Sequence, residues 1–293
     1  MSKKLKGTLS LLLATAIWGS TFVAQSVGVD QIGPFTFLAI RCVLAVFTLL
    51  PVLAICKKGD FLKTLKDPLL WKVGLLCGSA LFVATALQQL GLMYTSAGKS
   101  GFITAMYIVL VPIFGLFLKQ KPPKVILLSI AIAAVGLYFL SGSGLTGINI
   151  GDVLTLGCAA AFAVQILLLD RFAQDLDSVA LNMVQALVCA VISAAFMLTE
   201  TVNAGDILSC WLPLAYAGCL SMGVAYTLQI VGQKSLEPAT ASVLMSFESV
   251  FAAVSGWLIL NEKLSFAEII GCFLVFIAII IPQIPFQRIK KAP

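Results

Sequence analysis

The stretch Tyr226–Ser265 reads YTLQIVGQKSLEPATASVLMSFESVFAAVSGWLILNEKLS. It predicts the second half of one apolar helix, a tight connection at Glu237–Pro238, and a complete second apolar helix. Glu248 lies near the middle of that second helix, where an ionised carboxylate is unfavourable unless protein or water compensates for its lost hydration. The stretch therefore predicts a helix pair that faces a polar site.

The composition of the chain identifies its solvent. Of its 293 residues 60% are hydrophobic and 11% are charged, and the mean hydropathy is +1.05. A soluble domain carries about 25% charged residues, so most of this surface must face lipid. A membrane-spanning helix needs roughly 20 mainly apolar residues. Ten segments of that kind predict an all-α polytopic membrane protein: about 7–27, 34–56, 70–93, 97–118, 124–141, 151–169, 178–198, 209–233, 237–260 and 265–284.

Several kinds of chemistry are excluded or disfavoured. The chain has no histidine, which excludes a histidine-ligated metal. None of the eight cysteines has CxxC spacing, and all lie within or at the edges of apolar segments, where we expect them to pack as small apolar residues. The basic residues lie at helix ends rather than on one face. We therefore expect no metal, no cofactor, no nucleic-acid partner and no enzymatic reaction.

The basic residues predict the orientation in the membrane. If the N-terminus is cytoplasmic and ten helices alternate, 16 of the 19 basic residues lie inside, two lie outside and one, Arg41, lies within a helix. Basic residues are the ones that should show such a bias. The two outside are Lys99 and Lys263. We expect a multi-pass protein of the plasma or inner membrane with both termini cytoplasmic.

The second half of the chain repeats the pattern of the first. At an offset of 141, Gln88 aligns with Gln229 and Tyr107 with Glu248. At an offset of 144, Trp18 aligns with Phe162 and Arg41 with Gln185. The predicted halves are 1–143 and 147–293, connected through SGSGLTGIN. Five helices per half put the second half in the opposite orientation, and such inverted repeats are typical of secondary transporters with a site near the bilayer midplane.

Four motifs resemble the ten-helix EamA family of the drug/metabolite transporter superfamily. They are ATAIWGSTFVA (14–24), PFTFLAIRCVLA (34–45), LQQLGLMYTSAGKSGFI (87–103) and the stretch quoted above together with Ala225. The chain departs from the family pattern at LKQKPP, where a glutamate is common, and at Ser249, where a proline is frequent. The resemblance implies a membrane carrier for small metabolites, often an exporter of amino acids or related compounds, with a central cavity between the halves.

Polar and aromatic side chains recur on single faces of the predicted helices, and they must point away from lipid. Hydrogen bonding between helices is one explanation for them, and a polar central cavity is the other. Recurrence at repeat-related positions favours the cavity, and its aromatic members suit an amphipathic organic molecule. The candidate substrate-binding residues are Trp18, Thr21, Gln25, Arg41, Thr85, Gln88, Thr104, Tyr107, Phe162, Gln165, Gln185, Tyr226, Gln229 and Glu248.

Arg41 and Glu248 are the charged residues predicted to lie deep within spans, and each admits two interpretations. Arg41 either ties helix ends together or contacts substrate. Glu248 is either structural or the site of a proton or substrate. A direct or water-bridged pair between them stays open.

The sequence thus predicts a secondary transporter that moves a small amphipathic metabolite by alternating access. An amino acid or a related compound is the expected substrate and export the expected direction, with proton coupling and exchange both open. The alternatives are an importer or facilitator and a channel, while the scattered acids disfavour a membrane enzyme. The expected partners are the substrate and the lipid bilayer. A monomer should suffice for transport, and the oligomeric state is left open.

Overall fold

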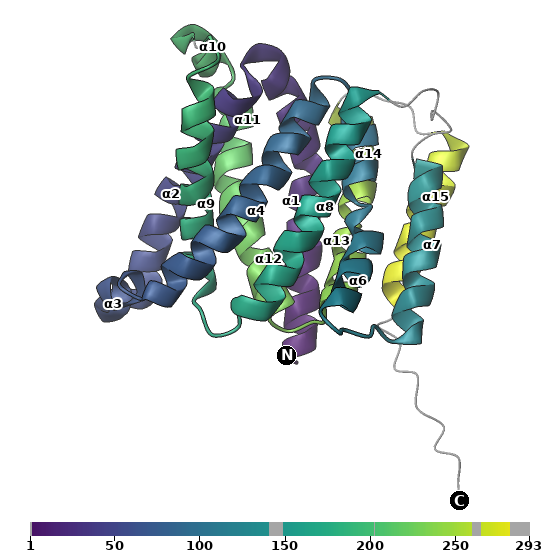
Figure 1. Cartoon of the computed structure of the whole chain (residues 1–293). Coiled ribbons are helices and arrows are strands. Elements are labelled where there is room, and N and C mark those ends of the chain that lie inside the picture. Colours follow the sequence, from purple (N-terminus) through teal and green to yellow (C-terminus); the bar gives the residue numbers. More distant parts are fainter. Residues whose placement is uncertain (1, 141–148, 202, 260–264, 282–293) are drawn as a thin grey trace, which may run out of the picture.

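The computed structural model of the chain describes residues 2–140, 149–201, 203–259 and 265–281. Within these ranges the chain is helical and has no strand. The helices stand side by side in a bundle with two ends (Figure 1). We call the end where the chain begins the N-face and the other end the far face. The main helices are α1 Lys3–Gln31, α2 Pro34–Lys57, α3 Phe61–Leu65, α4 Pro68–Leu92, α5 Ala97–Thr104, α6 Tyr107–Phe117, α7 Lys124–Leu140, α8 Ile150–Phe172, α9 Ser178–Met197, α10 Ala204–Ser209, α11 Trp211–Ala215, α12 Tyr226–Gln233, α13 Pro238–Met245, α14 Glu248–Ile259 and α15 Phe266–Ile280.

Eight helical segments are long and apolar enough to cross a bilayer, and two shorter apolar helices, α7 and α15, complete the set. These ten elements correspond to the ten predicted segments, which confirms the all-α polytopic class. Large apolar side chains such as Phe47, Leu75 and Phe273 are exposed, as contact with lipid requires.

Helices of the first half pack against helices of the second half. α2 contacts α9, α4 contacts α8, α7 contacts α15, and α1 contacts α14. Small residues allow this close approach: a Cβ atom on Gly136 of α7 would lie 2.9 Å from the carbonyl oxygen of Gly271 on α15. Lipid tails are as apolar as the helices, so close van der Waals packing supplies much of the attraction between them. The two halves are therefore interlocked rather than placed side by side as separate bodies.

Two spans that the sequence predicts as single helices are divided. The span 97–118 is broken before Tyr107, where α6 begins, and the span 237–260 is broken before Glu248, where α14 begins. Both spans lie where they were predicted, but the breaks within them were not predicted. Apolar periodicity runs through both breaks, because each is only a short, tightened turn of the backbone.

The two breaks share one pattern of backbone hydrogen bonds. In the first half, Met106 N–H donates to the carbonyl oxygen of Ile103 at 3.1 Å. At an offset of 141, Phe247 N–H donates to the carbonyl oxygen of Leu244 at 3.2 Å. Four further bonds match in the same way: Ala105–Gly101 with Ser246–Ser242, Ile108–Ala105 with Ser249–Ser246, Val109–Met106 with Val250–Phe247, and Leu110–Met106 with Phe251–Phe247. Discontinuous helices at corresponding positions of two halves are a feature of transporters built from inverted repeats.

On the far face, the pair of α2 and α9 is fastened by Glu200, which follows α9. Its carboxylate accepts hydrogen bonds from Phe35 N–H at 2.9 Å, from Thr36 N–H at 2.8 Å and from the Thr36 hydroxyl at 2.7 Å. A negative charge at the start of a helix is stabilised by the free N–H groups and by the helix dipole. A Cβ atom on Gly33 would lie 2.2 Å from Glu200 Oε2, so a side chain at this position would displace the carboxylate from the start of α2.

On the N-face, Asp177 fastens the other end of the same pair. Its carboxylate caps α9 and lies 3.0 Å from Lys57 Nζ at the end of α2. Burial alone would raise the pKa of the Asp177 carboxyl, but the bonds from Ala180 N–H and Lys57 outweigh burial and lower the pKa below its usual value. The Asp177 carboxylate, and with it the ion pair, therefore keeps its charge to a lower pH than an ordinary aspartate would.

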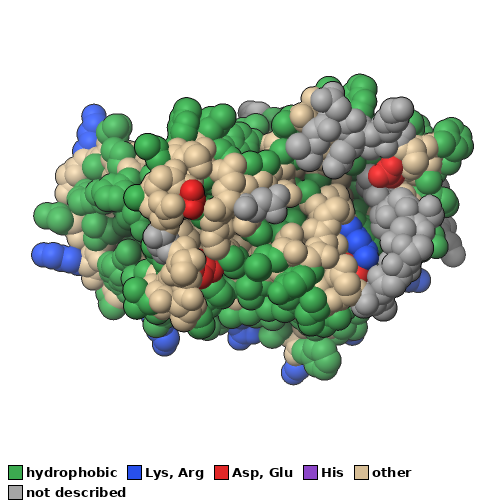
Figure 2. Space-filling view, turned by 90° about the horizontal axis from the view of Figure 1, so that it is seen from above, with side chains coloured by type: hydrophobic (Ala, Val, Ile, Leu, Met, Phe, Trp, Pro, Cys, Tyr) green, Lys and Arg blue, Asp and Glu red, His purple; other side chains and the backbone are tan. Residues whose placement is uncertain are grey.

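The charged residues divide between the faces. Lysines lie at the start of α1, at the end of α2, along α3 and at the start of α7, all on the N-face. Figure 2 looks at the far face, where hydrophobic and uncharged side chains cover most of the described surface. Lys263, one of the two basic residues expected on the outside, is not among the described residues.

Replacing Glu200 tests the fastening of α2 to α9. Glu200→Ala removes the acceptor for the first N–H groups of α2, and we expect a loss of about 0.5–2 kcal/mol in the free energy of unfolding. Reversible unfolding of the detergent-solubilised protein measures it. Asp206→Ala removes an exposed carboxylate from the first turn of the short helix α10, and it should cost less, because that carboxylate does not join two of the long helices. Equal effects of the two variants would contradict the assigned role.

Gly19 tests the contact between α1 and α14. A Cβ atom there would lie 2.4 Å from Phe251 Cβ and 2.6 Å from the Glu248 carbonyl oxygen. Gly19→Ala should push the two helices apart and cost about 1–3 kcal/mol of stability. Gly98→Ala is the matched control, because a Cβ atom at Gly98 meets nothing within 4 Å. Thermal unfolding measures the stability of both variants. If Gly19→Ala is as stable as Gly98→Ala or more stable, α1 and α14 do not approach so closely.

Candidate functional site

A cavity lies in the middle of the bundle, between the two halves. It is lined by residues of α1, α2, α4, α6, α8, α12, α13, α14 and the π-helical segment that precedes α12. The space inside it that is open to the centres of water molecules is about 30 Å³, about enough for two waters. The lining residues are Trp18, Thr21, Phe22, Gln25, Arg41, Gln88, Tyr107, Phe162, Ile166, Ser221, Tyr226, Gln229, Met245 and Glu248. The cavity is thus contracted, and its wall combines charged, polar and apolar side chains.

One end of the cavity carries a positive charge. Arg41 is only 3% exposed, and its Nη1 donates to Gln25 Oε1 on α1 at 2.5 Å. The guanidinium also lies 5.9 Å from the centre of the Phe37 ring, and its Nε has no hydrogen-bond partner among the described residues. Gln25 is a neutral partner, so the charge of Arg41 is not cancelled by an ion pair. This end can bind an anionic group.

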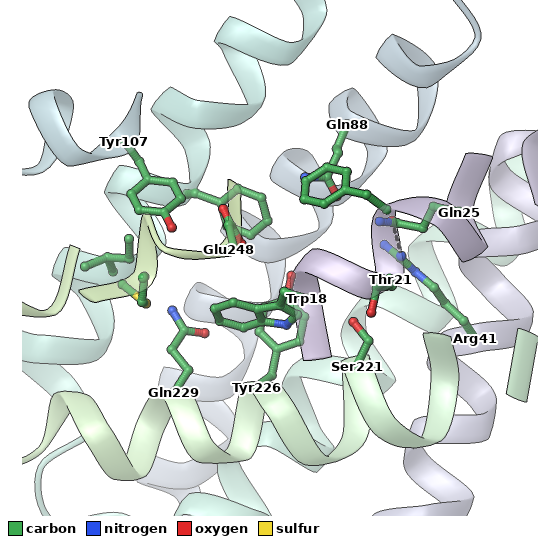
Figure 3. A pocket seen from close by; sticks show the side chains of 14 residues that line it. Trp18, Thr21, Gln25, Arg41, Gln88, Tyr107, Ser221, Tyr226, Gln229 and Glu248 are labelled. Atoms are coloured by element: carbon green, nitrogen blue, oxygen red, sulfur yellow. Dashed lines mark hydrogen bonds between the residues drawn. The ribbon is translucent and has the colours of Figure 1, made fainter. Parts of the chain in front are cut away.

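The other end carries the two residues that begin the broken half-helices. Glu248 is 5% exposed and Tyr107 is 3% exposed, and both point into the cavity (Figure 3). Neither Glu248 Oε1 nor the Tyr107 hydroxyl has a hydrogen-bond partner within the described structure. The two groups are near enough to interact electrostatically. Glu248 is the first residue of α14, where the positive end of the helix stabilises an ionised carboxylate. An ionised carboxylate can bind a cation or take up a proton.

Aromatic rings occupy the space between the charged ends. The Trp18 and Tyr226 rings lie with their centres 4.9 Å apart and tilted by 58° (Figure 3). Trp18 Nε1 is buried without a hydrogen-bond partner in the part of the chain that is described. Phe162, the repeat counterpart of Trp18, also lines the cavity. These rings provide an apolar wall and an unused donor, which suits an organic molecule with both polar and apolar parts.

No direct ion pair joins Arg41 to Glu248 in the described structure, where the ion pairs within 4.0 Å are Lys57–Asp177 and Lys99–Asp152. Figure 3 shows the reason: Arg41 turns toward Gln25, while Glu248 lies on the opposite side of the cavity, toward Tyr107. The two charges therefore mark separate ends of one cavity.

Ten of the fourteen candidate residues line the cavity, and the other four lie behind it. The Thr85 hydroxyl donates to the Leu81 carbonyl of its own helix at 2.8 Å. Thr104 accepts from Gln88 Nε2 at 3.2 Å. The remaining two, Gln165 and Gln185, form a chain behind the wall: Gln229 Nε2 donates to Gln165 Oε1 at 3.1 Å, and Gln165 Nε2 donates to Gln185 Oε1 at 3.2 Å. For these four, hydrogen bonding between or within helices is the role that the geometry gives. Substrate binding by the other ten stays a prediction.

Four lining residues were missed from the sequence: Phe22, Ile166, Ser221 and Met245. Three are apolar or aromatic, and no polar signal marked them. Ser221 was missed because its neighbour Met222 has the correct 3.6-residue spacing from Tyr226. The segment Tyr216–Ala225 is π-helical, and Tyr226 N–H bonds to the Ser221 carbonyl, five residues back. That wider turn brings Ser221 rather than Met222 to the cavity. π-Helical turns occur often at functional sites.

The far face is closed by contacts between the halves. Lys99 Nζ, near the start of α5, lies 2.7 Å from Asp152 Oδ2 on α8. The Thr95 hydroxyl donates to the other oxygen of Asp152 at 3.2 Å. Asn149 Nδ2 donates to the carbonyl oxygen of Tyr94 at 3.0 Å. This network, which we call the far-face closure, joins the first half to the second above the cavity.

Comparison with known proteins agrees with this architecture. The EamA-like transporter family matches the chain twice, over residues 5–142 and 149–282. An uncharacterized transporter of Archaeoglobus fulgidus is 34% identical over 280 residues, which cover 95% of this chain and 86% of that protein. The threonine/homoserine exporter RhtA of Salmonella typhimurium (strain LT2) is 34% identical over 162 residues, or 53% of each chain. A solved crystal structure shares the fold, with a TM-score of 0.80, 18% identity, and coverage of 95% of this chain and 96% of that one.

The two family matches together cover nearly the whole chain, one in each half. Two matches in succession agree with a chain built from two similar halves. The resemblance seen in the sequence motifs is confirmed. This chain belongs to the EamA-like transporter family, and it is a membrane transporter.

Proposed function

We propose that this transporter is a secondary carrier that exports a small zwitterionic amino acid, or a close relative of one, by alternating access. The observation that carries the proposal is the polarity of the central cavity. Arg41 lies at one end, Glu248 lies at the other, and aromatic rings line the space between them (Figure 3). An α-amino acid has the complementary groups: a carboxylate, an ammonium and a side chain.

The chemistry of each end favours one group of the substrate. The Arg41 guanidinium presents N–H donors to a carboxylate in a planar geometry that gives strong, directional hydrogen bonds. Glu248 and the free oxygen of Gln229 present acceptors to an ammonium. Glu248 is the one carboxylate among the lining residues. A proton and an ammonium would compete for it, which would couple the export of substrate to the uptake of a proton.

Alternating access explains the contracted cavity. The space inside is too small for an amino acid, so the halves must separate for a substrate to reach Arg41 and Glu248. The broken helices provide points where half-helices can tilt, because α6 and α14 begin inside the membrane at the cavity wall. In inverted-repeat carriers, one half rocks against the other around a central site.

We further propose that the N-face is cytoplasmic and that the protein lies in the plasma or inner membrane. The excess of lysine on the N-face supports this orientation. Export is supported by RhtA, whose name describes an exporter and which matches about half of this chain. One chain encloses the whole cavity, so a monomer is sufficient for the proposed cycle. An importer and a channel are the alternative functions.

Counterflow with Glu248→Gln tests the proposal. Liposomes containing the purified protein should show saturable counterflow of L-threonine or another amino acid of a broad panel, because a carrier returns only through its central site. Flux that does not saturate would indicate a channel, and no flux over the panel would contradict the proposal.

Glu248→Gln keeps the shape of the side chain but cannot take up the proton, so accumulation driven by a pH gradient should be lost. The control Asp206→Asn should transport normally. Normal transport by Glu248→Gln from pH 5 to 8 would rule out Glu248 as the proton site.

Arg41→Gln tests the carboxylate end. Loss of the guanidinium should raise KM for a zwitterionic amino acid by about 10-fold or more, because a hydrogen bond to a charged group is worth about 1.5–3 kcal/mol. The control is Arg171→Gln, an exposed arginine at the end of α8. Arg41→Lys keeps the charge and should recover part of the affinity. An unchanged KM in folded Arg41→Gln would show that Arg41 is structural.

A further inference from the structure

A second hollow opens on the N-face, below the central cavity. It lies among the α6–α7 connection, the end of α8 and the α12–α13 connection. The space in it that is open to the centres of water molecules is about 520 Å³. We call it the N-face vestibule. It is far larger than the contracted cavity above it and can admit an amino acid without a change in the bundle.

Gln233 connects the vestibule to the central cavity. It lines the vestibule, is 2% exposed, and donates from Nε2 to the carbonyl oxygen of Ile166 at 3.1 Å. A carbonyl can only accept, so this bond fixes which end of the amide is the oxygen. Gln233 Oε1 is left without a hydrogen-bond partner in the described structure. Ile166 and Gln229, one helical turn before Gln233, line the central cavity. One layer of side chains thus separates the two spaces.

Two carboxylates join this free oxygen in the vestibule. Asp170, near the end of α8, is half-buried and accepts a hydrogen bond from Gln120 Nε2 at 3.1 Å. Glu237, at the start of α13, is exposed, and its charge acts on Asp170. Neither carboxylate lies within 4.0 Å of a basic group in the described part of the chain. Both carboxylates are therefore free to interact with a cation in the vestibule.

The basic residues of the vestibule leave these acids free. The Lys234 ammonium donates to the carbonyl oxygen of Leu176, beyond α8. Lys121 is exposed at the rim. The inner wall therefore presents acceptors, while a positive charge stands near the opening. An ammonium group would find acceptors at Asp170, Glu237 and Gln233, and a carboxylate on the same molecule would lie toward Lys121.

From these contacts we infer that the N-face vestibule is a second substrate site, where the ammonium group of a zwitterionic amino acid binds before the molecule passes to the central cavity. The inference rests on the proposed function and adds a site to it. Gln233 and Gln229 lie one turn apart on α12, with a free oxygen on each. The ammonium can therefore move from the vestibule acceptors to those of the central cavity without losing all of its hydrogen bonds at once.

The sidedness of KM tests this site. The double variant Asp170→Asn and Glu237→Gln removes both charges and keeps the shapes of the side chains. For L-threonine approaching from the N-face, KM should rise about 10-fold, because the neutral amides still accept hydrogen bonds from the ammonium but hold it less strongly than carboxylates do. For L-threonine approaching from the far face, KM should stay unchanged. The maximal rate from the N-face should rise together with the N-face KM, because detailed balance keeps the ratio of maximal rate to KM equal in the two directions. Vesicles of both orientations, assigned by protease access to an N-terminal tag, give the two values.

The controls separate this inference from the proposed function. Asp60→Asn removes an exposed acid of the same face outside the vestibule and should leave both KM values unchanged. Asp170→Glu in the Glu237→Gln background should recover part of the N-face affinity. If the wild type transports and the double variant has the same N-face KM as the wild type, the vestibule site is overturned and the proposed function stands. The same conclusion follows if the KM of the double variant rises equally from both faces. Absence of amino-acid transport by the wild type would overturn both.

Discussion

An ionised carboxylate in the middle of a membrane costs at least about 2.5–3.5 kcal/mol, unless its surroundings replace the hydration that it loses. Glu248 has such surroundings because its helix is broken directly before it. The break places the carboxylate at the positive end of α14 and turns it into a cavity rather than toward lipid. Since no base pairs with it in the described structure, the cavity itself is what makes this residue tolerable. The close approach of α1 at Gly19 and the placement of α6 opposite both shape that cavity.

The duplicated architecture is symmetric in its backbone and unequal in its side chains. The same tightened turn precedes Tyr107 and Glu248, yet one offers a phenol and the other a carboxylate. Arg41 likewise has a neutral counterpart, Gln185, which lies behind the cavity wall. One half therefore supplies the positive end of the cavity and the other half the negative end. A single half could not bind both groups of a zwitterion, and this is a physical reason for the two halves to enclose one site.

Much of this could be predicted from the sequence, because helix number, burial and the sharing of a helix face follow from apolar periodicity. Arg41, Gln25, Tyr226 and Glu248 were found in that way. Periodicity could not reveal the helix breaks, since bonds of i→i−3 type keep the apolar face nearly in phase. It misplaced Ser221, because a π-helical turn changes the spacing. The vestibule could not be predicted at all, because its walls come from connections whose meeting depends on the packing of distant helices.

The central claim is that the two halves expose one cavity to the two faces in turn. Distances between pairs of spin labels, measured by pulsed electron paramagnetic resonance, test it most directly. One pair is placed at Gly98 and Ile150 on the far face, and the other at Lys121 and Ser235 around the vestibule. Addition of a transported amino acid should change the two distance distributions in opposite directions, one pair separating as the other closes. Distributions that stay fixed, or that widen together on both faces, would contradict the account.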